Sequence, residues 1–446
     1  MQALWVIAIT VNTIIVRLSP GTSSAQLYTC LCYIFSPGTA SQIDAVMSGK
    51  SDKQPAQVMT NLMSIPLYVY ANPNTFYTLH EGFTSTEVIF ARNMHLLYMN
   101  SKEAAFTEVD ETIDIMNVRK YPLFFIAQNR HTARVIVLPL TIFEEAINNM
   151  DDECDNQRQV VWFFHSTRCG STAWAQVFNA LPGWTVYSEP QIMHYTSVYG
   201  DHGCKSIQEF SQTPAFDRYV TLMIKYNLIN MPKGNNVFWK GTVLDEYMIP
   251  IIAKRFPKHK ILFGYRDILP NALSLTKLVA RFPAALVALR CTLSMAEQCE
   301  NKKVSISRII NTNFTSGLSR ENCHKVYTQV KLQNAFERVI FMLAARLSVV
   351  RNFATESTVR FVKYESLLSN QRAAISDLFH YLDVSVDLVD IAADALQCDS
   401  QAGLSIRRTD EVLPRRTWSR TDDSVQRCNI ILRLFNLPEI DSPLVM

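Results

Sequence analysis

Residues 158–385 alternate short, continuously apolar runs with segments of helical periodicity. Five of the apolar runs are predicted strands: QVVWFF, WTVYS, NVFWK, HKILFGY and TVRFVKY. Predicted helices follow the first, third, fourth and fifth of them: STAWAQVFNAL, DEYMIPIIAKRF, ILPNALSLTKLVARF and NQRAAISDLFHYL. Strands that are apolar throughout and alternate with helices are typical of a parallel sheet covered on both faces. The sequence therefore predicts an α/β fold in which helices cover both faces of a parallel sheet.

A polar, acidic segment separates this region from the N-terminal part of the chain. The segment NNMDDECDNQRQ, residues 148–159, lacks apolar periodicity and indicates a linker or a long loop. The strand-like runs before it are IPLYVYA, TEVIFARNMHLLYM, YPLFFIAQ and ARVIVLPL. The 446 residues are enough for two or three domains. We therefore expect a smaller mixed α/β or mostly β region of unknown function over 27–147, followed by the parallel-sheet domain over 158–446.

Residues 1–26 begin with an apolar run that indicates a targeting segment. The run covers residues 3–16, which is short for a membrane span of about 20 apolar residues. Its length suits the core of a signal peptide or a short membrane anchor, although the usual positive charge before the core is missing. A buried N-terminal helix or strand is the alternative interpretation.

Composition gives no sign of a nucleic-acid-binding surface or of a metal site. Hydrophobic residues make up 48% of the chain, charged residues make up 19%, and the formal net charge is +3. An anion site must therefore be local, built from a few arginines and backbone amides. The ten cysteines include no CxxC pair and no Cys/His cluster with zinc-finger spacing. We expect no nucleic-acid partner and no metal.

The turn between the first predicted strand and its helix has the composition of an anion-binding loop. Its sequence is STRCGST, residues 166–172. Gly170 allows a sharp turn, and the amides of Ser171 and Thr172 begin the helix without intrahelical acceptors, where the helix dipole favours an anion. Nucleoside-triphosphate loops carry two glycines and then Lys and Ser/Thr, whereas here the cation Arg168 precedes a single glycine. The loop is thus only P-loop-like, and taken alone it is also compatible with an ordinary capped helix start.

Other polar residues lie where the predicted strands end. Glu189 follows the second strand, Lys240 ends the third, and Arg266 follows the fourth, with Ser274 eight residues later. Each has a structural alternative: a cap carboxylate, a solvated lysine, or a salt bridge between Arg266 and Asp267. Because ligands of parallel α/β sheets bind at the carboxyl ends of the strands, these side chains and the loop together predict one site.

Four segments in combination resemble the sulfotransferases that use 3′-phosphoadenosine 5′-phosphosulfate (PAPS): FFHSTRCGSTAW, SEP, YRDILPNALSL and VKYESLL. The loop is similar to the 5′-phosphosulfate loop of that family, and Arg266 and Ser274 have the spacing of its 3′-phosphate motif. KYESLL resembles a Tyr-Glu-Asp-Leu-type segment, with Ser366 where Asp is common. The resemblance covers residues 158–385, roughly half of the chain.

The resemblance implies roles for the matched residues. Arg168 and Lys240 would act on the transferring group, and Glu189 would be the catalytic base. The residues that would bind PAPS are Arg168, Cys169, Gly170, Ser171, Thr172, Arg266, Ser274 and Tyr364. Trp174 lies one residue beyond a tryptophan that stacks on adenine in cytosolic members. The late basic cluster PRRTWSR, residues 414–420, would supply an arginine over the 3′-phosphate or would be a solvated loop.

The predicted base departs from the cytosolic small-molecule branch of that family. In that branch a histidine follows Lys-Thr at the third strand, whereas here Thr242 takes its place after Lys240 and Gly241. Tyrosylprotein sulfotransferases and some bacterial carbohydrate enzymes use a glutamate after the second strand instead. Glu189 lies 21 residues after Arg168, which suits this glutamate-base branch.

The resemblance therefore implies transfer of a sulfuryl group from PAPS, without a metal, to a hydroxyl or amine of a carbohydrate, a protein or a small molecule. A catalytically inactive nucleotide-binding protein on the same scaffold is one alternative. A P-loop kinase is another, and the missing Gly-Lys-[ST] end of the loop argues against it. Because carbohydrate and protein sulfation usually occurs in the Golgi lumen, the apolar N-terminus favours the secretory pathway and membrane association, with a cytoplasmic location as the alternative.

Overall fold

The computed structural model describes residues 37–48, 54–64, 76–150, 158–193, 202–204, 207–242, 245–280, 326, 328–330, 332–354, 359–397 and 421–446. The predicted targeting segment and the basic cluster at 414–420 lie outside these residues, so both stay predictions. The chain divides into two compact units, each assembled from separate stretches of sequence. The first comprises residues 1–114, 125–156 and 191–231, and the second comprises residues 115–124, 157–190 and 232–446.

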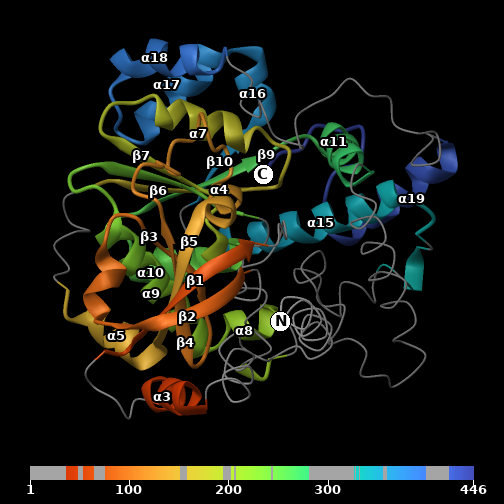
Figure 1. Cartoon of the computed structure of the whole chain (residues 1–446). Helices are drawn as coiled ribbons and strands as arrows, with labels where there is room; N and C mark the ends of the chain where they lie inside the picture. The colour runs from red at the N-terminus through yellow and green to blue at the C-terminus, as the bar shows by residue number, and fades with distance from the viewer. Residues whose placement is uncertain are drawn as a thin grey trace. The chain divides into compact units, whose positions relative to one another are not determined.

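The second unit is built on a parallel sheet of five strands (Figure 1). The strands are β6 (Val160–His165), β7 (Trp184–Ser188), β8 (Asn236–Lys240), β9 (Lys260–Tyr265) and β10 (Val359–Lys363). Their order is β10-β9-β6-β8-β7, and every neighbouring pair is parallel. All five strands predicted from the apolar runs are confirmed. The loops that follow β6, β7, β8 and β9 therefore leave the same edge of the sheet.

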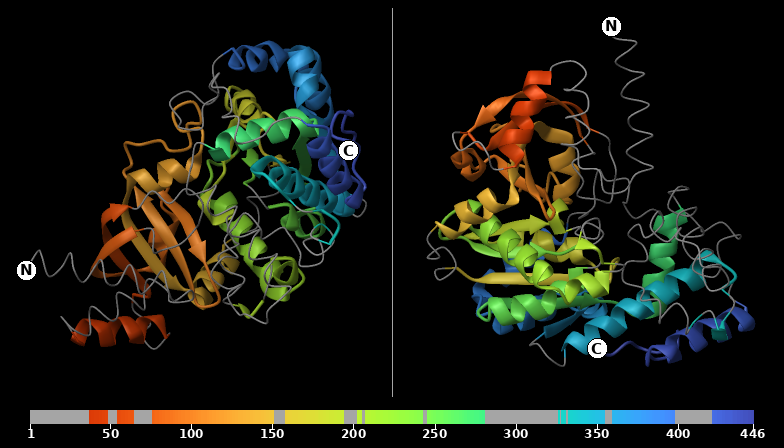
Figure 2. Two further views of the ribbon diagram at one scale, coloured as in Figure 1. Left: turned by 90° about the vertical axis from the view of Figure 1, so that its right-hand side faces the viewer. Right: turned by 90° about the horizontal axis from the view of Figure 1, so that it is seen from below.

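Helices cover both faces of this sheet. Figure 1 shows α7 (Ser171–Asn179), α17 (Gln371–Tyr381) and α18 (Val389–Ala395) on one face, with α10 (Ile249–Arg255) and α15 (Ala335–Ala354) on the other. The unit also contains η6 (Asp245–Met248), α11 (Ile268–Ala280), α16 (Tyr364–Ser369), η7 (Val386–Leu388) and α19 (Asp422–Leu434). Helices α15 and α19 lie side by side (Figure 2), and Arg427 of α19 pairs with the buried Glu337 of α15 at 2.8 Å.

Strand β6 is buried along its whole length because its side chains alternate between two apolar cores. Phe163 points to the core beneath α7 and α17, which contains Phe178 and Phe379. Trp162 points the other way, where its ring stacks on Trp239 with 4.2 Å between centroids and its Nε1 donates to His259. A strand apolar on both faces carries polar side chains only near its ends, which places the polar chemistry at the loop after His165.

The first unit contains an antiparallel sheet in the order β2-β1-β5-β4-β3. Its strands are β1 (Ala56–Ser64), β2 (Phe76–Thr84), β3 (Met94–Met99), β4 (Glu103–Val109) and β5 (Thr132–Pro139). Its helical elements are α3 (Pro37–Met47), η2 (Thr86–Phe90), α4 (Phe124–His131), α5 (Leu140–Asn148), η3 (Gln191–Met193), α8 (Ile207–Ser211) and α9 (Pro214–Asn230). The boundary between the two units falls within α4, so that its first residue, Phe124, belongs to the second unit. Over the ranges described above, no helix combines the length and the apolarity that a membrane span requires.

Several expectations for the N-terminal part need correction. YPLFFIAQ forms most of helix α4 rather than a strand, because a short apolar run fits a buried helix equally well and Pro122 precedes its first turn. TEVIF forms the 3₁₀ helix η2, so only the later part of its run is a strand. ARVIVLPL is confirmed as β5, apart from its last residue, and IPLYVYA lies outside the described residues. The units also differ from the contiguous ranges 27–147 and 158–446, because α9 joins the first unit, where Tyr226 donates to the carbonyl of Ile89.

Candidate active site

The loop between β6 and α7 has the backbone geometry of an anion-binding turn. Gly170 has φ +79° and is the N-cap of α7, whose first intrahelical bond runs from Trp174 N to Gly170 O. The amides before Trp174 have no acceptor within the helix, and the helix dipole makes this end electropositive. A Cβ at Gly170 would lie 2.4 Å from Cδ2 of Tyr364, so only glycine fits here. The loop thus presents amides to a ligand while one face of it packs on an aromatic ring.

The predicted 5′-phosphosulfate loop and the predicted 3′-phosphate clamp lie together. Arg168 Nε in the loop donates to Ser274 Oγ on α11 at 3.0 Å. Arg266, which follows β9, donates from Nη1 to the carbonyl oxygen of Arg168 at 3.4 Å. The Arg266 guanidinium also lies over the ring of Tyr364, 4.9 Å from its centroid. Two segments that are about a hundred residues apart in sequence therefore form one polar site.

One acidic side chain, that of Glu365, forms an ion pair with Arg266. Its Nε lies 3.7 Å from Glu365 Oε1, and the same oxygen accepts a hydrogen bond from the backbone amide of Asp267 at 3.3 Å. The Asp267 carboxylate pairs instead with Lys363 at 2.8 Å. The alternative interpretation, a salt bridge between Arg266 and Asp267, is therefore wrong. Each of these residues instead pairs with a residue of the 363–365 segment, Arg266 with Glu365 and Asp267 with Lys363.

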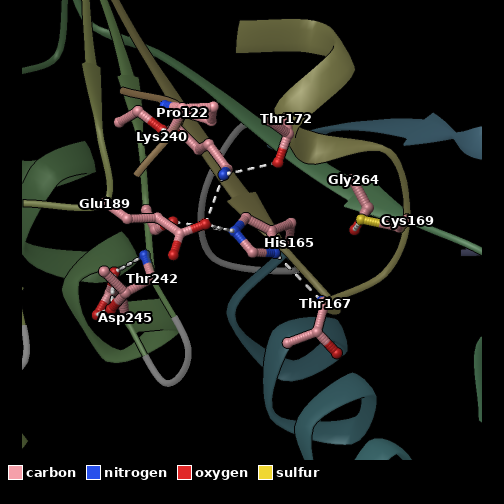
Figure 3. Close-up of polar contacts among 12 residues, drawn as sticks. Pro122, His165, Thr167, Cys169, Thr172, Glu189, Lys240, Thr242, Asp245 and Gly264 are labelled. Atoms are coloured by element: carbon pink, nitrogen blue, oxygen red, sulfur yellow. Dashed lines mark hydrogen bonds and ion pairs between the residues drawn. The ribbon is translucent and has the colours of Figure 1, made fainter. Parts of the chain in front are cut away.

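Lys240, at the end of β8, links the predicted base to the loop (Figure 3). Its side chain is completely buried, and its Nζ lies 2.5 Å from Glu189 Oε1 and 3.2 Å from Thr172 Oγ1. Glu189 directly follows β7 and has φ +54°, and its amide donates to the Lys240 carbonyl at 2.9 Å. The parallel pairing of β7 with β8 sets these two residues side by side. A carboxylate, an ammonium and the first turn of α7 thus converge.

His165, the last residue of β6, is part of this site and was not predicted from the sequence. Its Nδ1 accepts a hydrogen bond from the amide of Thr167 at 3.2 Å, which leaves the ring proton on Nε2. Nε2 lies 2.9 Å from the Gly241 carbonyl and 3.9 Å from Glu189 Oε1. Burial holds the pKa of His165 well below its ordinary value of 6.5, and the charge of Lys240 lowers it further. The imidazole is therefore neutral at physiological pH, and its place immediately before the loop was the signal that could have found it.

A buried ionic network supports the site from beneath. Arg346 on α15 binds Glu246 through two hydrogen bonds of 3.0 Å and donates to the carbonyl of His165 at 3.1 Å. Next to Glu246, burial raises the pKa of the Asp245 carboxyl well above its usual range. Both the amide and the hydroxyl of Thr242 donate to Asp245. Thr242 is thus held by Asp245 through both its amide and its hydroxyl.

The side chains of Cys169 and Trp174, which the family resemblance placed at the nucleotide, are buried in the protein. Cys169 is buried, its thiol donates to the carbonyl of Gly264 at 3.3 Å, and burial raises its pKa to about 11. The thiol is therefore inert at neutral pH, and only the backbone of Cys169 is available to a ligand. Trp174 lies within the core beneath α7 and is 1% exposed, so the suggestion that it stacks on adenine is wrong.

The site contains buried donors and acceptors that have no hydrogen-bond partner within the described part of the protein. Among the described residues, four atoms near the loop are buried without a hydrogen-bond partner: Thr167 Oγ1, Arg266 Nε, Asn271 Oδ1 and Glu365 Oε2. Such groups each cost about 1–3 kcal/mol when unsatisfied. Phosphate oxygens can accept from the hydroxyl and the guanidinium, and hydroxyls or an exocyclic amine can donate to the two acceptors. In the same part of the chain, no cluster of three or more His, Cys, Asp or Glu side chains could hold a metal ion.

Comparison with known proteins gives weak similarity to several solved structures, two of which are described below. No family model matches the sequence, and no curated protein matches it. A sulfotransferase from Alicyclobacillus acidocaldarius is 13% identical over 62% of this chain and 92% of its own, with a TM-score of 0.33. A sulfotransferase from Mycobacterium tuberculosis H37Rv is 8% identical over 59% of this chain and 79% of its own, with a TM-score of 0.30. Similarity this weak does not assign a function, so the function has to be inferred from the geometry of the site.

Proposed function

We propose that this chain transfers a sulfuryl group from PAPS to a hydroxyl or amine acceptor. The observation that carries the proposal is the position of the buried Lys240 ammonium between Glu189 Oε1 at 2.5 Å and Thr172 Oγ1 at 3.2 Å. One cation thus joins a carboxylate that can accept a proton to the start of an anion-binding helix. Sulfuryl transfer needs both groups within reach of the same reacting centre.

Two cationic parts of the site suit the two ends of a doubly phosphorylated nucleotide. The first amides of α7 and the Arg168 guanidinium would hold the 5′-phosphosulfate. Arg266 and Ser274 would hold the 3′-phosphate. The hydrogen bonds of Arg168 to Ser274 and of Arg266 to the Arg168 carbonyl support this assignment, because they keep both parts in one site. Without such partners, each buried phosphate would cost several kcal/mol, on the order of the penalty for an unpaired charge.

In the transfer step, Glu189 takes the proton of the acceptor hydroxyl or amine, and the acceptor atom uses its electron pair to form the new bond to sulfur. The bond between sulfur and the bridging oxygen breaks, and its electron pair stays on the 5′-phosphate oxygen. Lys240 and Arg168 offset the negative charge that grows on that oxygen. PAPS supplies the activated sulfuryl group, and the chain supplies position and charge, as in phosphoryl transfer.

The test is transfer of radiolabelled sulfate from PAPS to a panel of sugars, peptides and small alcohols or amines, with Glu189→Gln as the decisive variant. We expect Glu189→Gln to lose about 10²–10⁴-fold in transfer rate, the usual contribution of a general base, while it keeps its affinity for adenosine 3′,5′-bisphosphate. Glu439, an exposed residue of the same unit, provides the matched control Glu439→Gln, which should transfer sulfate at the wild-type rate. Transfer by Glu189→Gln at the wild-type rate would remove Glu189 as the base.

Thermal melting separates this proposal from the two alternatives. At 100 times its Kd, a ligand of the folded state stabilises it by about 2.7 kcal/mol. We expect adenosine 3′,5′-bisphosphate to raise the melting temperature and ATP with Mg²⁺ to leave it unchanged. A response to ATP with Mg²⁺ alone would favour a kinase, and a response to the bisphosphate without transfer to any acceptor would favour a binding protein.

A further inference from the structure

The His165 imidazole holds together three segments of the candidate site. Its Nδ1 accepts from the loop amide of Thr167 at 3.2 Å, and its Nε2 lies 2.9 Å from the Gly241 carbonyl beyond β8. Nε2 also lies 3.9 Å from Glu189 Oε1, the oxygen that Lys240 holds at 2.5 Å. Figure 3 shows the imidazole and the Lys240 ammonium on adjacent sides of this carboxylate. The same oxygen therefore has a second N–H donor at hand, about 1 Å beyond hydrogen-bond distance.

We propose that His165 is a positioning residue that holds the Glu189 carboxylate by its Nε2–H when Lys240 turns from Glu189 to the leaving group. This inference rests on the proposed function, because it concerns the base of that reaction. The Lys240 ammonium pairs with Glu189 in this structure, whereas during transfer the same charge must offset the charge on the bridging oxygen. A carboxylate that Lys240 has left would lose the orientation that proton abstraction requires, unless another donor holds it.

The tautomer of His165 suits this task. The amide of Thr167 occupies Nδ1, so the single ring proton is on Nε2, which donates to the Gly241 carbonyl at 2.9 Å and lies 3.9 Å from Glu189 Oε1. Thr167 has φ +61°, in the left-handed region, and its amide donates to the ring at 3.2 Å. The donor is therefore set by the backbone of the loop itself, which couples the orientation of the base to the conformation of the nucleotide-binding turn.

The charges around the ring keep it neutral in the working pH range. Five titratable or charged groups belong to the elements packed against the ring: Lys240 at the end of β8, Glu189 after β7, Arg346 on α15, and Asp245 and Glu246 on η6. Burial, Lys240 and Arg346 all lower the pKa of His165. A neutral ring can donate to Glu189 without adding a positive charge next to Lys240.

The decisive experiment compares His165→Gln with His165→Asn in the full chain. The glutamine amide nitrogen reaches the position of Nε2 and can donate to Gly241 and Glu189, whereas asparagine replaces only the acceptor at Nδ1. We expect His165→Asn to lower kcat by about 10- to 100-fold, the effect of losing one hydrogen bond to a charged group. We also expect the acid limb of its pH–rate profile to rise by about one pH unit, because a carboxylate without its donor binds protons more tightly.

His165→Gln should restore kcat to within about threefold of the wild type and return the acid limb to its place, since it keeps the donor. His165→Asn, which keeps an acceptor for the Thr167 amide, should bind adenosine 3′,5′-bisphosphate with wild-type Kd. His259 offers a matched control, because it is a buried histidine of the same unit that instead accepts from Trp162 Nε1 at 3.0 Å. His259→Gln and His259→Asn should leave the acid limb unmoved. Equal kcat and equal acid limbs in the two His165 variants would overturn the proposal.

A spectroscopic arm decides the inference even where His165→Asn fails to fold or the wild type transfers no sulfate. In histidine-¹⁵N-labelled wild-type protein, His165 should be neutral with its proton on Nε2 at pH 6. In the complex with adenosine 3′,5′-bisphosphate, the Nε2–H signal should shift when Glu189 is replaced by glutamine. A ring protonated on Nδ1, an imidazolium at pH 6, or a signal insensitive to Glu189→Gln would refute the role of His165. Absence of transfer with the expected spectrum would refute only the proposed function.

Discussion

Gly170→Ala tests whether the anion-binding loop and the 3′-phosphate clamp are mechanically linked. Gly170 has φ +79°, and an added Cβ would lie 2.4 Å from Cδ2 and 2.5 Å from Cε2 of Tyr364. Ordinary contacts of this kind begin at about 3.5 Å, so the ring must move by roughly 1 Å. Because the Arg266 guanidinium lies 4.9 Å from the centroid of the same ring, a displaced Tyr364 also displaces the clamp.

Two contributions set the size of the effect. An alanine held in the left-handed region costs about 1–2 kcal/mol relative to glycine. Overpacking against the partly buried ring of Tyr364 costs about 1–3 kcal/mol more. The free energy of unfolding should therefore fall by about 2–5 kcal/mol, which for a unit of this size lowers the melting temperature by on the order of 10 °C. The affinity for adenosine 3′,5′-bisphosphate should fall as well, because the change displaces both the loop and Arg266.

Gly183→Ala is the matched control for this prediction. Gly183 has φ +73°, but nothing lies within 4 Å of an added Cβ, so it bears only the conformational cost of about 1–2 kcal/mol. In urea unfolding, Gly170→Ala should have a lower free energy of unfolding than Gly183→Ala. When Tyr364→Ala is combined with Gly170→Ala, the extra loss should disappear, which a double-mutant cycle reports as a coupling energy between the two positions. If the two glycine variants are equally stable and Tyr364→Ala adds independently, the clash does not exist and the linkage between loop and clamp is refuted.

Three further predictions concern charges in the site. Arg266→Ala should weaken binding of adenosine 3′,5′-bisphosphate by about 10- to 100-fold in calorimetry, the value of one charge-assisted contact, and an unchanged Kd would remove Arg266 from the clamp. Glu246→Gln should cost about 3–5 kcal/mol in urea unfolding, because it leaves the buried Arg346 without its carboxylate; a loss below about 1 kcal/mol would contradict this. The folded-state pKa of His165 is depressed, so its contribution to stability is present above the unfolded pKa of about 6.5 and is lost as pH falls below it. Between pH 7.5 and 5.5, the wild type should therefore lose about 1.4 kcal/mol more than His165→Gln, and equal losses would show that the imidazole is protonated in the folded protein.

The parallel sheet could be predicted from the sequence because its strands are apolar on both faces. Such runs are unambiguous where helices of clear periodicity separate them, as around β6 and β9. The same pattern predicted that Glu189, Lys240 and Arg266 lie at one edge of the sheet, because the carboxyl ends of parallel strands share one edge. What the pattern could not provide is the strand order, which pairs β7 with β8 and thereby brings Glu189 to Lys240.

The antiparallel unit was harder to predict for a physical reason. Strands β1 and β2 mix polar and apolar residues without strict alternation, and their pairing contains irregularities near Met59 and Asn61 that shift the register. The apolar run of α4 carries no periodicity that separates a buried helix from a strand. Helix α9 belongs to this unit although it follows β7 in sequence, a relation that only tertiary packing determines.

Several backbone conformations of the site could not be predicted from residue types. Five non-glycine residues of the described chain have positive φ, and three of them, Thr167, Arg168 and Glu189, belong to the site. Each such residue costs about 1–3 kcal/mol and persists only where its surroundings fix it. Here those surroundings are themselves parts of the site: the amide of Thr167 is held by His165, and the amide of Glu189 is held by the Lys240 carbonyl. Relaxing Thr167 would separate its amide from His165, and relaxing Glu189 would separate its amide from the Lys240 carbonyl. The strained backbone of these residues therefore maintains contacts from which the candidate site is built.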